Sequence, residues 1–183
     1  MIRDEALNFV RANVKNGNLI KHMLATEAIM RALAQRFGED EEEWGLTGLL
    51  HDIDIELVGE NFSDHGRIGA DLAAEQDVSP QVCHAIMCHN WTNGIPCVTP
   101  LDNALLCTDP LTGLITAGAL IRPDRKLAAL TVETLMKRFG ERRFAAGASH
   151  EQIAFCSEIG LELEVFVGIG LEAMKEIADE LGL

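Results

Sequence analysis

The sequence contains no tyrosine, and aromatic residues make up only 5% of its 183 positions. Basic residues are also scarce: 15 lysines and arginines stand against 29 aspartates and glutamates, which gives a formal net charge of -14 at pH 7. This balance argues against a broad basic surface that neutralises phosphates along DNA or RNA. We therefore predict no nucleic-acid polymer as a partner, whereas a small anion can bind where a metal ion supplies local positive charge.

Long apolar runs are missing as well. No stretch reaches the length of about 18 apolar residues that a membrane-spanning helix needs. The opening residues MIRDEALNFV carry acids early and lack the basic and then apolar order of a signal peptide. We therefore expect no membrane interaction and a cytoplasmic protein. The sequence gives no expectation for an oligomeric state.

Cysteine usage excludes the usual cysteine-based scaffolds. The chain has five cysteines, an odd number, and no two of them stand in CxxC spacing. Neither a disulfide framework nor a cysteine zinc site is indicated. We expect these residues to be reduced thiols, most of them buried.

What the chain does have is helical periodicity. Apolar residues recur at helical spacing almost throughout, and the alternating pattern of strands is rare. The pattern predicts an all-α protein and, since no flexible linker divides it, a single domain over residues 1–183. We expect helices at about residues 3–14, 18–37, 41–57, 64–77, 80–89, 100–121, 127–138, 150–159 and 161–181. Three starts have chemical support: an N-cap at Ser79 before a proline, and capping boxes that begin at Thr99 and Ser149.

Six polar side chains in apolar surroundings are candidate metal ligands: His22, His51, Asp52, His65, His89 and Asp109. An imidazole on the apolar helix face of His22 needs a hydrogen bond or a metal, because burying it unpaired is costly. Neighbours on a helix point about 100° apart. The pair His51-Asp52 therefore meets a metal only if its side chains converge or if Asp52 reaches between two metals. Asp109 precedes Pro110, which predicts a kink or break that aims the carboxylate inward.

This order of ligands resembles the HD superfamily of metal-dependent phosphohydrolases. LLHDID is similar to the signature pair of the family, DHGRIGADLAAE to the segment after it, AIMCHN to a downstream histidine and ALLCTDPLTGLI to the closing aspartate. The segment FAAGASHEQIAFCSEIGLELEVF is similar to the C-terminal part of small bacterial and archaeal predicted HD-superfamily hydrolases. The resemblance implies an HD-type helical bundle with a motif core at residues 21–121 and a C-terminal helical part at 122–183.

Residue by residue, the resemblance implies one metal held by His22, His51, Asp52 and Asp109. A second metal would add His65 and His89, with Asp52 bridging the two. Two positions differ from the family pattern: Asn90 stands where many binuclear members have a second adjacent histidine, and Ile55 where related oxygenases have a lysine. The implied cofactor is one or two divalent transition metal ions (Mn, Fe, Co, Ni or Zn), which suit imidazole and carboxylate ligands better than Ca²⁺ does.

The implied activity is hydrolysis of a phosphate ester of a nucleotide or other small phosphorylated metabolite by metal-activated water. Asp52 would hold the metals and help to orient the nucleophile. Glu56, four residues later on the expected helix, is either a solvated acid or a catalytic residue that orients a ligand or carries a proton. Arg67 either binds a substrate phosphate or forms a surface salt bridge. We expect His84 to be structural or exposed.

Two other functions fit the same residues. A di-iron HD-type oxygenase would use the same six ligands, and a non-catalytic scaffold would bind metal or nucleotide without turnover. Oxygen uptake by the iron-loaded protein would identify the oxygenase. A melting temperature that shifts with nucleotide, without turnover of phosphate esters, would identify the scaffold.

Overall fold

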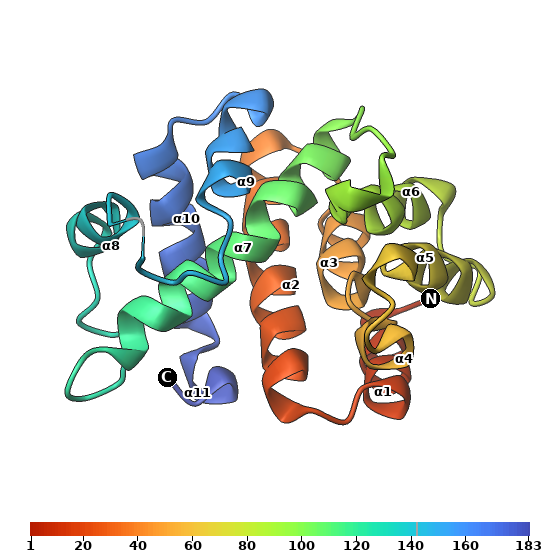
Figure 1. Ribbon diagram of the computed structural model, residues 1–183, viewed down its shortest axis with the longest axis horizontal. Coiled ribbons are helices and arrows are strands. Elements are labelled where there is room, and N and C mark those ends of the chain that lie inside the picture. The colour runs from red at the N-terminus through yellow and green to blue at the C-terminus, as the bar shows by residue number, and fades with distance from the viewer. Residues whose placement is uncertain (142) are drawn as a thin grey trace.

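The computed structural model describes residues 1–141 and 143–183, and within these ranges it contains helices and no strand (Figure 1). The predicted all-α class is therefore confirmed. The α-helices are α1 (Arg3–Asn13), α2 (Gly17–Phe37), α3 (Glu41–Leu50), α4 (Ile55–Val58), α5 (Arg67–Ala74), α6 (Pro80–His89), α7 (Pro100–Leu120), α8 (Val132–Phe139), α9 (His150–Ala154), α10 (Leu163–Glu176) and α11 (Ala178–Leu181). Short 3₁₀ helices are η1 (Phe62–Asp64), η2 (Trp91–Asn93) and η3 (Phe155–Ile159).

Side chains start several helices as the sequence predicts. Ser79 accepts a hydrogen bond from the Val82 amide at the start of α6, and Thr99 forms a capping box with Asp102 at the start of α7. Ser149 caps α9 by accepting from the Gln152 amide. These caps satisfy amides that have no partner within their helices.

The prediction of one helix over residues 41–57 is wrong. Helix α3 ends at Leu50, and the chain tightens into a turn in which the Ile53 amide donates to the Leu50 carbonyl and the Ile55 amide to the Asp52 carbonyl. These bonds join residues three apart, whereas an α-helix joins residues four apart. His51, Asp52 and Asp54 therefore lie on a turn, and their side chains do not have to point about 100° apart as successive residues of an α-helix do.

Of the kink or break predicted at Pro110, the break is wrong. Helix α7 runs from Pro100 to Leu120 with the proline inside it, and Pro110 is buried. The missing N–H of a proline weakens a helix, but α7 packs against α2, α3, α6, α8, α9 and α10, and this burial holds it in place. Asp109 therefore faces inward because of the side of α7 that it occupies.

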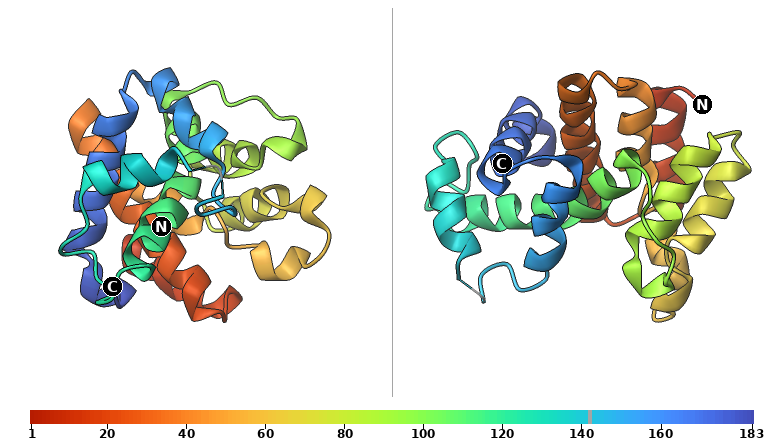
Figure 2. Two further views of the ribbon diagram at one scale, coloured as in Figure 1. Left: turned by 60° about the vertical axis from the view of Figure 1, so that its left-hand side comes forward. Right: turned by 90° about the horizontal axis from the view of Figure 1, so that it is seen from above.

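Helices α2 and α7 form the centre of the molecule (Figure 1). Seen from above, α3, α5 and α6 lie at one end and α8 at the other, with α2 between them and α7 running across (Figure 2). Helix α2 packs against α3, α7 and α10, and α6 packs against α5 and α7. The largest fully buried side chains include Met23, Ile29, Leu49, Leu111 and Phe166. The motif helices and the later helices thus share one core.

Helices α2 and α3 approach each other closely at Gly48. A Cβ atom added there would lie 2.8 Å from backbone atoms of Thr26 and Glu27. Only glycine allows this approach, which brings the histidine of α2 toward the turn after α3. No helix among the described residues is long and apolar enough to cross a membrane.

Candidate metal centre

The fold gathers the six candidate ligands from five separate segments. His22 lies on α2, His51 and Asp52 on the turn after α3, His65 before α5, His89 at the end of α6 and Asp109 in the middle of α7. In sequence the outermost two are far apart, yet His22 Nε2 lies 3.1 Å from Asp109 Oδ1. The packing of α2, α3, α6 and α7 therefore assembles the cluster.

Asp52 occupies the centre of the cluster. Its Oδ2 lies 3.4 Å from His22 Nε2 and 3.5 Å from His51 Nε2. Its Oδ1 lies 3.3 Å from His65 Nε2 and 3.5 Å from His89 Nε2. The two oxygens of one carboxylate thus face two different pairs of imidazoles, which is the arrangement that a bridging carboxylate requires.

Backbone carbonyls fix the tautomers of two histidines. His51 Nδ1 lies 2.8 Å from the Gly48 carbonyl oxygen, and His89 Nδ1 lies 2.6 Å from the Ile86 carbonyl oxygen. Because a carbonyl only accepts, each Nδ1 carries the hydrogen. The neutral imidazole then presents the lone pair of Nε2 to the cluster.

Side chains do the same for the other two histidines. Thr112 Oγ1 donates to the Asp109 carbonyl, so it accepts from His22 Nδ1 at 2.7 Å. His65 Nδ1 donates to Asp54 Oδ1 at 2.8 Å, while Asp54 Oδ2 accepts from the amides of Gly66 and Gly69. All four imidazoles are therefore oriented through Nδ1, with Nε2 turned toward Asp52.

This donor set fits a divalent transition metal. His22 Nε2 and His51 Nε2 lie only 3.1 Å apart, and two neutral nitrogens with inward lone pairs have no hydrogen to share, so a proton or a cation has to balance them. Ligand atoms of His22, His51 and Asp109 lie within 4.8 Å of one another, as do those of His51, Asp52 and His89. Imidazole and carboxylate groups so arranged are ligands for Mn, Fe, Co, Ni or Zn.

Protonated histidines can also supply the positive charge that the carboxylates of the cluster require. Burial lowers the pKa of His22, but hydrogen bonds with Asp109 and Asp52 outweigh it and raise that pKa to about 10. Burial likewise opposes charge on His65, yet Asp52 and Asp54 raise its pKa to about 10. Burial lowers the pKa of His51 to about 4. In the absence of a cation, two imidazolium groups therefore balance the carboxylates.

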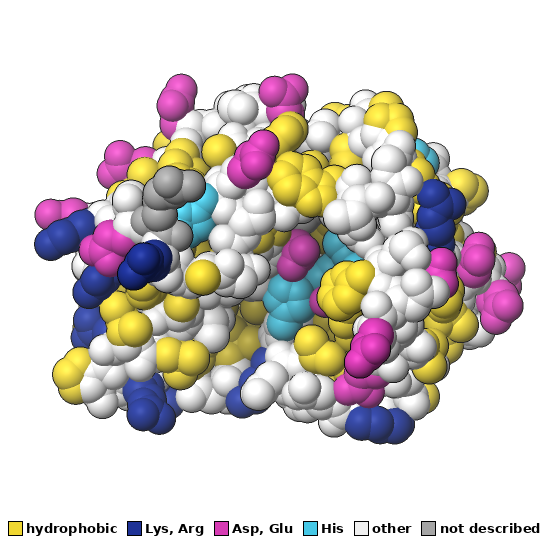
Figure 3. All heavy atoms as spheres, in the orientation of Figure 1, with side chains coloured by type: hydrophobic (Ala, Val, Ile, Leu, Met, Phe, Trp, Pro, Cys, Tyr) yellow, Lys and Arg dark blue, Asp and Glu magenta, His cyan; other side chains and the backbone are white. Residues whose placement is uncertain are grey.

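The cluster opens to solvent on one side. The side chains of His22 and Asp109 are 23% and 31% exposed, whereas that of His51 is fully buried. A hollow of about 270 Å³ adjoins the exposed pair and is lined otherwise by small residues of α7 and of residues 145–148. Figure 3 shows histidine and acidic atoms at the floor of a recess near the middle of this face. A ligand therefore reaches the cluster past His22 and Asp109.

Two predicted catalytic residues are not part of this cluster. Glu56 is exposed, and its carboxylate accepts from the amides of Lys15 and Asn16 at 2.8 Å. The sequence reasoning placed it on the face of Asp52 because it assumed a continuous helix, which the turn interrupts. Arg67 donates to the Asn93 carbonyl at 3.2 Å and does not line the hollow. Its contact with a phosphate stays a prediction.

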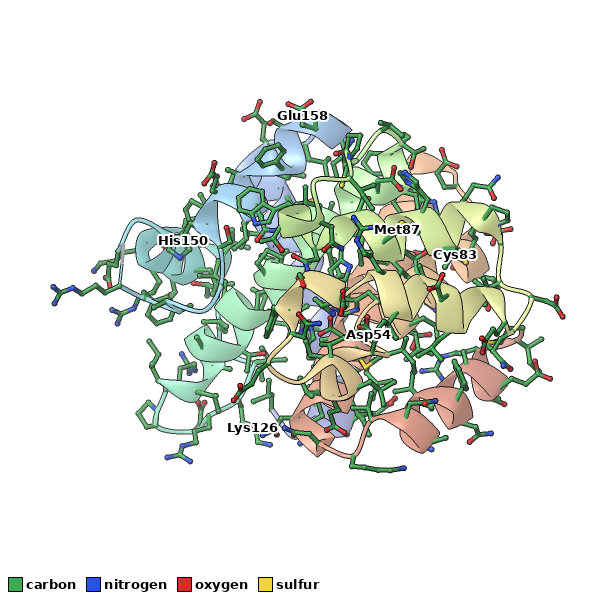
Figure 4. The ribbon with its side chains drawn as sticks, turned by 45° about the vertical axis from the view of Figure 1, so that its right-hand side comes forward. Asp54, Cys83, Met87, Lys126, His150 and Glu158 are labelled. Atoms are coloured by element: carbon green, nitrogen blue, oxygen red, sulfur yellow. The ribbon has the colours of Figure 1, made fainter. Side chains whose placement is uncertain are left out.

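Sequence reasoning missed two residues that orient ligands. Asp54, labelled in Figure 4, is fully buried and holds His65. Thr112 holds His22 from α7. Asn90, at the position of the missing second histidine, donates to the carbonyls of Phe62 and His65 and so fixes the segment before α5. The signal available in the sequence was that each of these polar residues lies within three positions of a candidate ligand.

Comparisons with known proteins find one matching family model and several proteins of similar sequence. Residues 19–102 match the family model described as the HD domain. Ribonuclease Y of Sulfurovum sp. (strain NBC37-1) is 30% identical over 173 residues, which cover 90% of this chain and 32% of that protein. Ribonuclease Y of Geotalea uraniireducens (strain Rf4) is 29% identical over 164 residues, 89% of this chain and 28% of that protein. The chain thus spans less than a third of either relative. No solved structure matches it.

The relatives correct one expectation. The name of ribonuclease Y states that those proteins cleave RNA, which contradicts the prediction that excluded a nucleic-acid polymer. The prediction rested on the net charge of -14, an average over the whole surface. A phosphodiester is cleaved at one point, where bound metal ions supply positive charge, so the average did not justify the exclusion.

The HD match and the geometry agree on the same part of the chain. Five of the six clustered side chains lie inside residues 19–102, and Asp109 follows shortly afterwards. The match and the His/Asp cluster together support a metal-dependent hydrolase in general. The match therefore identifies an HD domain within residues 19–102 of the chain.

Proposed function

We propose that this protein is a metal-dependent hydrolase of phosphate esters in nucleotides, with a phosphodiester of RNA as its preferred substrate bond. The observation that carries the proposal is the convergence of four oriented Nε2 atoms on the two oxygens of Asp52. The names of the relatives favour RNA over other phosphate esters.

In this proposal Asp52 bridges two metal positions. His22, His51 and Asp109 complete the position that faces the hollow, and His65 and His89 complete the inner one. When bound, the metal ions supply Lewis-acid activation of water and neutralise charge on the phosphate. The chain itself engages Nδ1 of each histidine, which turns Nε2 toward the metal positions.

The hollow explains how a substrate would be oriented. Its lining beyond His22 and Asp109 consists of Pro110, Gly113, Ala117 and residues 145–148, with no lysine or arginine among them. Among the described residues that line this hollow there is no cation to meet an entering phosphate, so its binding should depend on the metal. The small side chains leave room for a sugar or base next to the phosphate.

The test is hydrolysis by protein of measured metal content. Metal-free protein is loaded with Mn²⁺, Co²⁺, Ni²⁺ or Mg²⁺ and assayed on a 5′-labelled single-stranded RNA, on mononucleotides and on bis(p-nitrophenyl) phosphate. We expect metal-dependent cleavage of RNA that Asp52→Asn abolishes, together with loss of bound metal.

Three results would contradict parts of the proposal. Cleavage of mononucleotides alone would remove RNA as the substrate. Oxygen uptake by the iron-loaded protein, without hydrolysis, would favour the oxygenase. A nucleotide-dependent rise in melting temperature without any turnover would favour the scaffold.

A further inference from the structure

A second group of metal-binding side chains lies on another face of α6. His84 and Cys88 are four residues apart on that helix and so share one side of it. Ligand atoms of His84, Cys88 and Asp102 lie within 4.8 Å of one another. Cys97, in the loop between η2 and α7, places its Sγ 3.0 Å from Cys88 Sγ. A histidine, two thiols and a carboxylate therefore meet outside the HD centre.

Asp102 has an unused acceptor at this point. The residue is fully buried, and its Oδ2 accepts from the amides of Val98 and Thr99 at 3.0 and 2.9 Å. His84 Nδ1 lies 3.1 Å from the same oxygen. Its Oδ1 is buried and has no hydrogen-bond partner among the described residues. A buried carboxylate oxygen without a partner costs free energy, and a bound cation would remove that cost.

The two thiols lack strong partners as well. Cys97 Sγ contacts the Cys88 carbonyl at 3.6 Å, and Cys88 Sγ contacts the Ala85 carbonyl at 3.6 Å. Thiols are weak donors, so these contacts leave both sulfurs available as ligands. Cys88 is buried, whereas Cys97 is partly exposed on its loop.

We propose that His84, Cys88, Cys97 and Asp102 form a zinc site that is separate from the HD centre. One nitrogen, two sulfurs and one oxygen make a tetrahedral ligand set that suits Zn²⁺. Binding would release the two thiol protons to solvent, with no change of oxidation state. Two sulfurs on a tetrahedral zinc ion are about 3.8 Å apart, so Cys97 would move outward slightly with its loop.

An entry path for the ion is present. A surface hollow of about 280 Å³ is lined by Pro80, Gln81, His84, Val98, Thr99 and Asp102. None of these lining residues is a lysine or arginine, so no protein cation opposes the metal there. The bound ion would tie the loop before α7 to α6 and hold the start of α7 against it.

This site also explains why the cysteine spacing gave no signal. The ligands stand as a histidine and a cysteine one helical turn apart, then a cysteine and an aspartate five residues apart. A CxxC pattern is absent because each half of the site supplies only one thiol. The loop from Asn90 to Thr99 has to fold back onto α6 before the ligands meet.

Cobalt distinguishes the two metal sites, because only the proposed zinc site contains thiolates. Metal-free, reduced full-length protein is titrated with Co²⁺ and followed by absorption. We expect a thiolate-to-cobalt charge-transfer band in the near ultraviolet, with one equivalent of Zn²⁺ abolishing it. Cys88→Ser and Cys97→Ser should lose the band, whereas Cys83→Ser, on the same helix but outside the cluster, should keep it. Asp52→Asn should also keep it, because that residue belongs to the HD centre.

The parent protein alone can overturn the proposal. Absence of the band at saturating Co²⁺ in fully reduced parent protein would refute the zinc site, whatever the variants do. A band that persists in both Cys88→Ser and Cys97→Ser, with native circular dichroism, would assign it to other thiols. Recovery of a disulfide between Cys88 and Cys97 from protein purified without reductant, with no bound metal, would also refute it.

Discussion

Replacing Gly48 by alanine tests whether the close approach of α2 and α3 builds the metal centre. The new Cβ would lie 2.8 Å from backbone atoms of Thr26 and Glu27, whereas ordinary contact begins at 3.4 Å, so the helices must separate by about 0.6 Å. Overpacking of a core costs about 1–3 kcal/mol, and contact with rigid backbone places this site near 3 kcal/mol. The higher helix propensity of alanine returns about 1 kcal/mol. The net loss should be about 2 kcal/mol.

The same displacement should weaken metal binding. His22 on α2 and His51 after α3 hold their Nε2 atoms 3.1 Å apart, and metal–ligand distances tolerate only about ±0.2 Å. We therefore expect the Kd for metal to rise about 10- to 100-fold in Gly48→Ala. The melting temperature of the metal-free protein should fall by about 4–8 °C.

The assay is thermal unfolding in chelator, followed by metal titration of each variant. Gly17→Ala is the control, because a Cβ at Gly17, the first residue of the neighbouring helix α2, meets nothing within 4 Å. The control should keep parental metal affinity and a melting temperature at or slightly above that of the parent. If Gly48→Ala behaves like Gly17→Ala in both measurements, the close approach does not position the ligands.

Three further predictions concern the residues around the cluster. Asp54→Asn should leave the protein folded but raise the Kd for metal about 10- to 100-fold, because Asp54 orients His65 through Nδ1; equal affinity in a competition titration would show that this contact is dispensable. Glu56→Gln should keep metal content and turnover within about twofold of the parent, since its carboxylate bonds to the amides of Lys15 and Asn16; loss of turnover with retained metal would return Glu56 to the catalytic set. Metal binding should also strengthen as pH rises: the pKa of His22 and of His65 is raised to about 10 in the metal-free protein, so below that pH each bound ion displaces protons. The apparent Kd should then fall about tenfold per pH unit for each proton displaced, and a Kd that stays constant between about pH 6 and 8 would contradict the protonation of these imidazoles.

Most helices could be predicted from the sequence, because the signals that form them lie within the helix itself. Apolar spacing and caps such as Ser79 and Thr99 act within one helix, so they predict the helices that contain them. The turn at residues 51–54 was not predicted, because its tightening depends on contacts with α2 and α5. Asp54 was missed for the same reason: its partners His65, Gly66 and Gly69 lie 11 to 15 residues away. The candidate ligands came from polar residues in apolar surroundings, a resemblance assigned them to metal positions, and the fold brought them together.

The uneven exposure of the cluster has a consequence for ion exchange. His22 and Asp109 border solvent, whereas His51, His65 and His89 are enclosed. In the binuclear centre proposed here, the ion beside the hollow exchanges directly with water, and the inner ion leaves only after the protein opens locally. A chelator should therefore strip the centre in two kinetic phases. Such a centre would retain its inner ion when the metal supply changes. The outer position would be occupied by whichever metal ion is available in solution.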